Sequence, residues 1–142
     1  MSVTSVFKVV LDEGAKLPVK AHALDAGFDM FSREKVVIKA KSFAVFDTGV
    51  HIDISPGYVG FLKSKSGLNV NHSIVSKVVI DAGYTGSIVI KLYNHGTEDY
   101  VVNKGDKISQ IVFLPIPDIV LDIAESLSDS ERGDKGFGST GK

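Results

Sequence analysis

Apolar residues fall in short runs that alternate with polar residues, and turn signals separate the runs every eight to twelve residues. In the clearest run Val50, Ile52 and Ile54 share one face of an extended chain, and the polar residues between them share the other. No long stretch shows apolar residues at helical spacing, and the one helical turn we expect is at 69–72. The expected strands are 3–10, 36–38, 43–46, 48–54, 58–62, 78–80, 87–92, 100–102 and 108–114. The pattern predicts an all-β sandwich or barrel.

Two turns are predicted from their glycines. Ser55-Pro56-Gly57 has proline and glycine where a type II turn needs them. Between the runs 78–80 and 87–92, we expect a tight glycine-containing turn that makes a hairpin. Such a hairpin would hold Asp81 and Tyr84 at a fixed separation on rigid supports, as a reactive site requires. An ordinary surface hairpin with a solvated aspartate would show the same pattern.

Composition and charge narrow the classes of function. The 142 residues, 44% hydrophobic and 23% charged, are typical of one globular domain. A net charge of -1 gives no basic field for a nucleic-acid backbone, so an anionic ligand would need a few local cations. The absence of cysteine excludes disulfides, thiolate chemistry and a cysteine-ligated metal. The chain shows neither a signal-peptide pattern nor an apolar run of membrane length, so we expect a cytoplasmic protein with no membrane partner.

The character of the sequence changes after Leu127. Residues 128–142 contain one large apolar residue, Phe137, and four glycines, which is too little apolar surface to order the segment. We therefore expect a β-barrel core at 1–127 and a flexible arm at 128–142. A frayed terminus is the ordinary interpretation. However, an arginine, an aromatic residue between glycines and then Ser-Thr-Gly would suit an arm that closes over a ring and phosphates.

Several polar groups could bind an anion. Lys65-Ser66-Gly67 offers a cation, a hydroxyl and an exposed backbone N–H after a strand. Gln110 places an amide inside a strand, and Arg132 with Ser139 and Thr140 forms a second group of donors. Each signal is weak alone, because such loops and strand-face glutamines are usually just solvated.

In combination these groups suggest a nucleoside triphosphate as the ligand. Two anion sites accompany one carboxylate, Asp81, and two rings that could stack, Tyr84 and Phe137. The histidines have no metal-ligand spacing and are interpreted as structural or surface residues: His22, His51, His72 and His95.

Five segments, in order and spread over nearly the whole chain, resemble the five motifs of the trimeric dUTP pyrophosphatases, or dUTPases. They are Ala26-Gly27-Phe28-Asp29-Met30, Lys65-Ser66-Gly67-Leu68, Ile80-Asp81-Ala82-Gly83-Tyr84-Thr85-Gly86, Gly105-Asp106-Lys107-Ile108-Ser109-Gln110 and Arg132-Gly133-Asp134-Lys135-Gly136-Phe137-Gly138-Ser139-Thr140-Gly141. The third and fifth segments are specific, and the other three support them.

The resemblance implies a distorted β jelly roll assembled as a homotrimer, with each active site built from all three subunits. It implies hydrolysis of dUTP to dUMP and diphosphate, which keeps uracil out of DNA and supplies dUMP for thymidylate synthesis. The carboxylate matching Asp81 would deprotonate the water that attacks the α-phosphorus, a role that suits an ionised aspartate. Mg²⁺ would be bound by triphosphate oxygens and water, with Asp29 touching that water shell.

The resemblance also assigns the substrate contacts. Tyr84 would lie under the deoxyribose, and backbone groups of Ser76, Val78 and Ile80 would read the uracil. Phosphates near the scissile bond would be held by Lys65, Ser66, Gly67 and Gln110. The far phosphates would be held in the arm by Arg132, Gly138, Ser139 and Thr140. The aromatic residue covering the base would be Phe137, with Tyr93 as the alternative.

Lys65 stands where the family usually has arginine, so the charge is kept but the planar two-pronged grip on phosphate is lost. We expect activity to survive this change. Two other functions stay open beside dUTP hydrolysis. A dCTP deaminase of the same superfamily would need a further acid or base beside the pyrimidine, and 76–80 offers none. A binding or regulatory protein would keep the fold while its catalysis is incidental.

Overall fold

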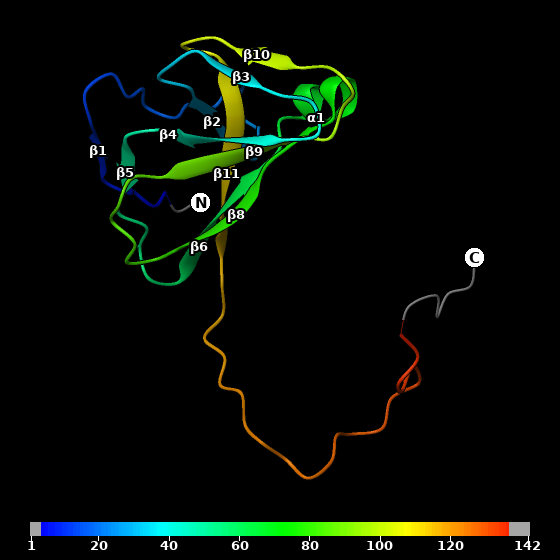
Figure 1. The fold of residues 1–142 in the computed structure, drawn as a ribbon. Helices are drawn as coiled ribbons and strands as arrows, with labels where there is room; N and C mark the ends of the chain where they lie inside the picture. Colours follow the sequence, from blue (N-terminus) through cyan, green and yellow to red (C-terminus); the bar gives the residue numbers. More distant parts are fainter. Residues whose placement is uncertain (1–3, 137–142) are drawn as a thin grey trace.

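The strands pair antiparallel throughout residues 4–136, the range that the computed structural model describes. They are β1 (Val9–Leu11), β2 (Gly27–Phe31), β3 (Val36–Ile38), β4 (Phe43–Asp47), β5 (Val50–Ile52), β6 (Tyr58–Lys63), β7 (Ile74–Val75), β8 (Lys77–Asp81), β9 (Val89–Asn94), β10 (Tyr100–Val102) and β11 (Lys107–Pro115). A single short helix, α1 (Ser66–His72), lies between β6 and β7 in this range (Figure 1). The all-β prediction is confirmed.

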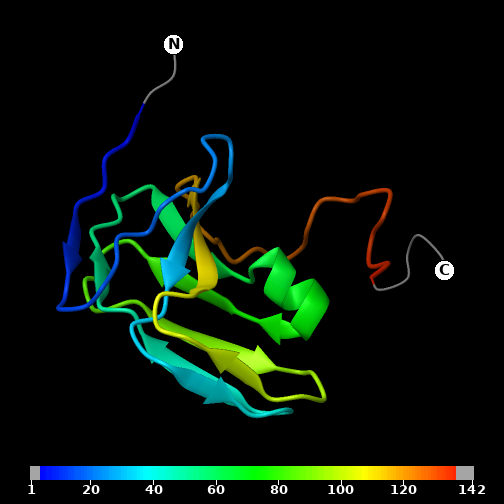
Figure 2. The same ribbon diagram turned by 90° about the horizontal axis from the view of Figure 1, so that it is seen from above.

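The strands form four small sheets that curve around one core (Figures 1 and 2). The largest sheet has the order β2-β11-β6-β8, and a second has the order β4-β9-β7. The remaining strands form the pairs β1–β5 and β10–β3. Strand β8 therefore lies at the edge of the largest sheet within the described range.

The alternating run at 50–54 has the burial that its pattern predicts. Val50, Ile52 and Ile54 are only 2%, 4% and 1% exposed, respectively. They belong to an apolar cluster that includes Phe46 on β4 and Ile90 on β9. Burial of this cluster is the main driving force for the fold, since each fully buried aliphatic side chain contributes about 1.5–3 kcal/mol.

The expected hairpin between 78–80 and 87–92 is wrong. Strand β8 pairs with β6, with Asp81 opposite Val59, whereas β9 pairs with β4 and β7. The connection 82–88 instead crosses from one sheet to the other. It is seven residues long, which exceeds a tight hairpin loop, and its last residue, Ile88, is buried in the core. Asp81 is therefore supported by β6 and not by β9.

Several element boundaries differ from expectation, among them 48–54, which is strand only at Val50–Ile52, and 87–92, which is strand at Val89–Asn94. The first strand is Val9–Leu11 and not 3–10. Gly27–Phe31 forms β2, which the pattern did not predict because Asp29 is buried within it instead of alternating outward. Helix α1 begins three residues before the expected turn, since the backbone N–H of Asn69 donates to Lys65 O at 2.9 Å. The type II turn at 55–57 is confirmed, with Gly57 at φ +90° and a 3.2 Å bond from Tyr58 N to Ser55 O.

The chain leaves the sheets after Pro115, and both views show the segment 116–136 extending away from the strands (Figures 1 and 2). Its apolar side chains are largely exposed, with Leu121 and Ile123 at 93% and 100%. Within 4–136 there is no helix with the length and apolar character needed to span a bilayer.

Candidate active site

Asp81 lies exposed at the end of β8, where the chain makes a tight turn. The backbone N–H of Tyr84 donates to Asp81 O at 3.2 Å, and Gly83 has a φ of +92°. This is the positive φ that the third position of a type II turn requires and that glycine adopts without strain. The turn therefore fixes Asp81 and Tyr84 close together, as the sequence predicted, although the support is a different strand pair.

The ring of Tyr84 is fixed by contacts with its own loop. Its hydroxyl donates to Ser87 O at 2.7 Å. The ring lies against Gly86, where an added Cβ would come within 2.5 Å of the hydroxyl oxygen. Because the hydroxyl also anchors the ring to Ser87, the ring cannot move aside cheaply, so glycine at 86 leaves the space that Tyr84 occupies. Tyr84 is still 46% exposed, which leaves surface for a ligand.

A hollow of about 270 Å³ opens beside these two residues. It is lined by Val78, Val79, Ile80, Asp81, Tyr84 and Val89. Because β8 is an edge strand, alternate residues direct their backbone N–H and C=O groups away from β6. On that side no other strand of the described residues pairs with β8. The hollow therefore combines a ring, a carboxylate and free backbone donors and acceptors.

Ser76 was expected to share this hollow and lies apart from it. Its side chain is buried, and the Ser64 hydroxyl is bonded both to Ser76 N, at 2.9 Å, and to Ser76 O, at 3.2 Å. Of the three residues expected to read uracil through their backbone, Val78 and Ile80 line the hollow and Ser76 does not.

A second polar cluster forms around Asp29 on β2. Its carboxylate, only 2% exposed, forms ion pairs with Lys65 and, at 3.3 Å, with Lys107. Burial alone would raise the pKa of the Asp29 carboxyl, but the hydrogen bonds and charges of the two lysines outweigh burial and hold the pKa below its ordinary value. The result is a fixed carboxylate that positions two ammonium groups at one end of the sheet.

Gln110 and the start of α1 adjoin this cluster. Gln110 is opposite both Asp29 and Lys63, and its amide nitrogen donates to Ser64 O at 3.0 Å. Its side chain lies over Gly27, where any Cβ would collide with it. Ser66 and Gly67 form the first turn of α1, whose N–H groups have no partner within the helix. The structure thus brings together the four residues expected to hold the phosphates near the scissile bond.

The two clusters occupy opposite ends of the β6–β8 pair. Asp81 is opposite Val59, while Gln110 is opposite Lys63, four residues further along β6. At about 3.3 Å per residue this is a separation of about 13 Å before Lys65 is reached. Within one chain, the carboxylate and the phosphate donors are therefore far apart.

The remaining predicted residues lie elsewhere. Tyr93 is four residues along β9 from Val89 and stacks on His95, with ring centroids 6.0 Å apart. Arg132 lies in the extended segment, where it donates to Lys135 O at 2.7 Å and to Gly136 O at 3.1 Å. The predictions for Phe137, Gly138, Ser139 and Thr140 lie outside the described residues.

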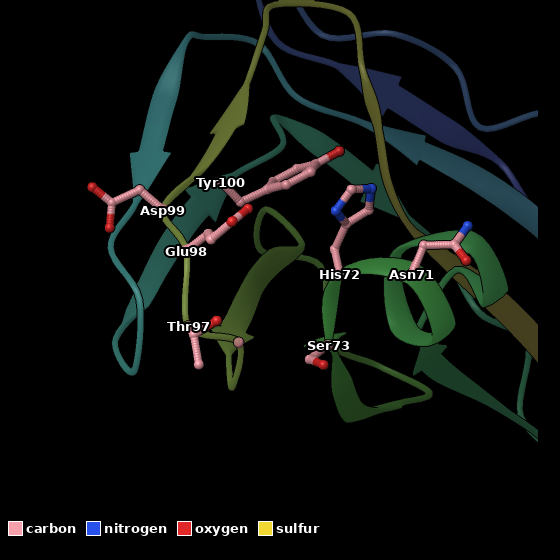
Figure 3. A pocket seen from close by; sticks show the side chains of 8 residues that line it. Asn71, His72, Ser73, Thr97, Glu98, Asp99 and Tyr100 are labelled. Carbon is pink, nitrogen blue, oxygen red and sulfur yellow. The ribbon is translucent and has the colours of Figure 1, made fainter.

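A separate hollow of about 190 Å³ lies between the end of α1 and the segment before β10 (Figure 3). The rings of His72 and Tyr100 meet there with centroids 4.9 Å apart. None of the residues predicted for the site lines it.

From the sequence, Lys107 is assigned no role of its own and is named only within the fourth motif. Its role depends on pairing with an aspartate distant in sequence, and β11 departs from regular register between Lys107 and Ser109. No local signal in the sequence reveals this pairing, because Asp29 and Lys107 lie on different strands that meet only in the folded sheet.

The donors suit phosphate better than a bare metal. In the described part of the chain, no group of three or more His, Asp or Glu side chains could hold a metal ion, and both Asp29 oxygens already bind lysines. A hard cation bound through phosphate oxygens and water fits such a site, because Mg²⁺ keeps much of its hydration.

An exposed carboxylate beside a ring-lined hollow, together with cations and amides placed for phosphate, suits the hydrolysis of a phosphorylated nucleoside. The family model described as dUTPase matches residues 13–141. The deoxyuridine 5'-triphosphate nucleotidohydrolase of Clostridium acetobutylicum is 43% identical over 134 residues, covering 92% of each chain. That of Kluyveromyces lactis is 36% identical over 144 residues, covering 99% of this chain and 97% of the relative. The chain belongs to the dUTPase family.

Solved structures agree with this assignment. A Staphylococcus bacteriophage 80alpha dUTPase with dUPNHPP matches with a TM-score of 0.92 and 34% identity, covering 98% of this chain and 100% of that one. A dUTPase mutant from phage phi11 of S. aureus, described with a structural Mg(II) ion, matches with a TM-score of 0.81 and 31% identity, covering 88% of this chain and 100% of that one.

Proposed function

We propose that this chain is a dUTP diphosphatase in which Asp81 activates the attacking water. Hydrolysis of dUTP is the activity of the family to which the chain belongs. The assignment of Asp81 as the general base rests on its position. Asp81 is exposed at the end of edge strand β8, beside the hollow that Tyr84 lines. An aspartate held there can accept a proton from a water one hydrogen bond away.

In the proposed reaction, water attacks the α-phosphorus of dUTP and gives its proton to the Asp81 carboxylate. The bond from the α-phosphorus to the bridging oxygen breaks, diphosphate leaves, and the water oxygen stays in dUMP. Phosphoryl transfer depends mainly on positioning and charge neutralisation. Positioning and charge neutralisation would come from Lys65, Gln110 and the first-turn amides of α1. Lys107 would help to fix Lys65, because both lysines pair with the Asp29 carboxylate. Mg²⁺ bound to the triphosphate would neutralise further charge, and Asp29 would contact its water shell.

Selection of the nucleotide would come from the hollow. Backbone groups of β8, at Val78 and Ile80, would match the donor and acceptor pattern of uracil and oppose that of cytosine. The ring of Tyr84, fixed against Gly86, would lie under the deoxyribose, where a ribose 2′-hydroxyl would collide with it.

A panel of four nucleotides tests this function. Wild-type protein with Mg²⁺ should release diphosphate from dUTP, with UTP, dCTP and dTTP turned over at least about 10²-fold more slowly. Diphosphate release is measured by a coupled assay and ammonia release in parallel, so that hydrolysis and deamination are distinguished. Ammonia from dCTP would instead support a deaminase, and tight dUTP binding without turnover would support a binding protein.

We further propose that the working enzyme is a homotrimer with sites shared between subunits, and that the arm at 128–142 closes them. The separation of Asp81 from the Lys65 cluster supports this, because one nucleotide would then meet Asp81 of one copy and the lysines of another. The exposed apolar residues of 116–127 support association as well, since such a run is seldom left in water.

Mixing two inactive variants tests the shared site. Asp81→Asn and a Lys65→Ala/Gln110→Ala double variant should each be nearly inactive, but co-expressed mixtures should regain activity. If subunits mix at random, about a quarter of the sites would have both sets of donors intact. Activity of the isolated mixed assemblies, sized by light scattering, is the measurement. Mixed assemblies as inactive as their parents would place the whole site within one chain.

A further inference from the structure

His51 on β5 lies between two hydrogen-bond acceptors. Its Nδ1 is 2.8 Å from the backbone oxygen of Thr85, and its Nε2 is 3.0 Å from Asp12 Oδ2. A carbonyl oxygen and an ionised carboxylate can only accept, so both ring nitrogens must carry hydrogen for both bonds to form. The geometry therefore selects the doubly protonated imidazolium.

The charges around the ring favour the same form. The Thr85 carbonyl, and then the carboxylate of Asp12, hold the pKa of His51 above its ordinary value, and Asp47 on β4 adds to this effect. A further hollow of about 520 Å³ opens beside His51, and besides Asp12 its charged lining residues are Lys8, ahead of β1, and Asp53, after β5. The side chain is 27% exposed, so these interactions are partly shielded from solvent.

The segment that His51 contacts is the one that carries Tyr84. Thr85 follows Tyr84 directly, within the connection 82–88 that crosses between sheets. The far end of this connection is fastened by the Ser87 hydroxyl to Asp47 and by Thr48, which donates through its backbone and its hydroxyl to Ile88 O. His51 supplies the side-chain bond at Thr85, next to the ring itself.

We propose that doubly protonated His51 is a positioning residue that holds Tyr84 in place through the Thr85 backbone, and thereby sets how well the enzyme distinguishes deoxyribose from ribose. The inference rests on the proposed function, in which Tyr84 lies under the sugar. His51 does not touch the substrate in this role. It links β5 and the end of β1 to the loop that does.

The sign of the pH dependence follows from the bonds. Below the raised pKa of His51 both bonds are present, and the loop is held. As pH rises through that pKa, one nitrogen becomes an acceptor and faces another acceptor, so one of the two bonds is lost. Selectivity for dUTP over UTP should therefore fall as pH rises.

The test is the ratio of kcat/KM for dUTP to that for UTP from about pH 6 to 9, with His51 followed by NMR over the same range. Both nucleotides carry the same base and triphosphate, so their own titrations cancel in the ratio. In the wild type the ratio should fall about 3–10-fold, with a midpoint matching the NMR titration of His51. His51→Gln should abolish the pH dependence of the ratio.

Two further variants keep the test decisive. Asp12→Asn removes the charge partner with little change of shape, and should move the NMR midpoint and the selectivity midpoint to lower pH together. His72→Gln, a histidine near Tyr100 and away from the loop, should leave the profile unchanged.

An unchanged profile in His51→Gln, or an NMR midpoint that moves in Asp12→Asn while selectivity does not follow, would overturn the inference and leave dUTP hydrolysis standing. A wild type that shows no turnover of dUTP at any pH would overturn the proposed function and the inference together.

Discussion

Asp81→Asn should lower kcat for dUTP by about 10²–10⁴-fold while the affinity for the nucleotide is retained, because the amide cannot accept the proton of the attacking water. Asparagine has nearly the same shape, and the turn depends on the backbone bond from Tyr84 N to Asp81 O, which the substitution keeps. Single-turnover diphosphate release, together with titration of a non-hydrolysable dUTP analogue, separates the chemical step from binding.

A matched control is available at Asp99, an exposed carboxylate that pairs with Lys39. Asp99→Asn makes the same change of charge, and exposed ion pairs contribute little, so its kcat should equal that of the wild type. Equal activity of Asp81→Asn and the wild type would remove Asp81 from the chemistry.

Truncation before Arg132 should lower kcat/KM for dUTP by at least about 10²-fold without lowering the stability of the barrel. The lost segment contains the cation and hydroxyls proposed to hold the far phosphates and the ring proposed to cover the base. The barrel should be unaffected because its last strand, β11, ends at Pro115. Steady-state kinetics and thermal unfolding of the same preparation measure the two effects.

Removal of Lys142 alone is the control for this truncation, since it shortens the chain without touching the fifth motif. Arg132→Ala in the full-length chain then shows how much of the loss belongs to the cation. Normal turnover in the truncated enzyme would mean that 128–142 is only a frayed end.

The alternation of residue types was sufficient to predict the class of fold and much of the core. Val50, Ile52 and Ile54 were expected to share a face, and all three are buried. The turn at 55–57 followed from the positions of proline and glycine alone. Such features are local, because the period of a strand and the φ of a turn depend on a few neighbouring residues.

Strand pairing was not predictable in the same way. The strands before and after Asp81 look like a hairpin in sequence, yet they join different sheets, because their partners β6 and β4 lie earlier in the chain. The ion pairs of Asp29 with Lys65 and Lys107 escaped prediction for the same reason. Nothing near Asp29 in the sequence reveals that it will be buried between two cations from other elements.

Part of the candidate site could be predicted from the sequence, and part of it could not. The five motifs named the residues for the hollow and for the phosphate cluster, and most of these residues lie in those two places. Ser76 lies apart from the hollow because its backbone groups are bonded to the Ser64 hydroxyl, and Arg132 lies in the extended segment, apart from the phosphate cluster. The distance between the two clusters is a property of the strand register, which only the three-dimensional structure provides.

A crystal structure of the enzyme with Mg²⁺ and a non-hydrolysable dUTP analogue would show whether Asp81 holds the attacking water. The Asp81 carboxylate should accept a hydrogen bond from an ordered water that lies in line with the α-phosphorus, with the uracil against β8. A carboxylate that points away from the nucleotide, with no water between it and the α-phosphorus, would contradict the proposed role of Asp81.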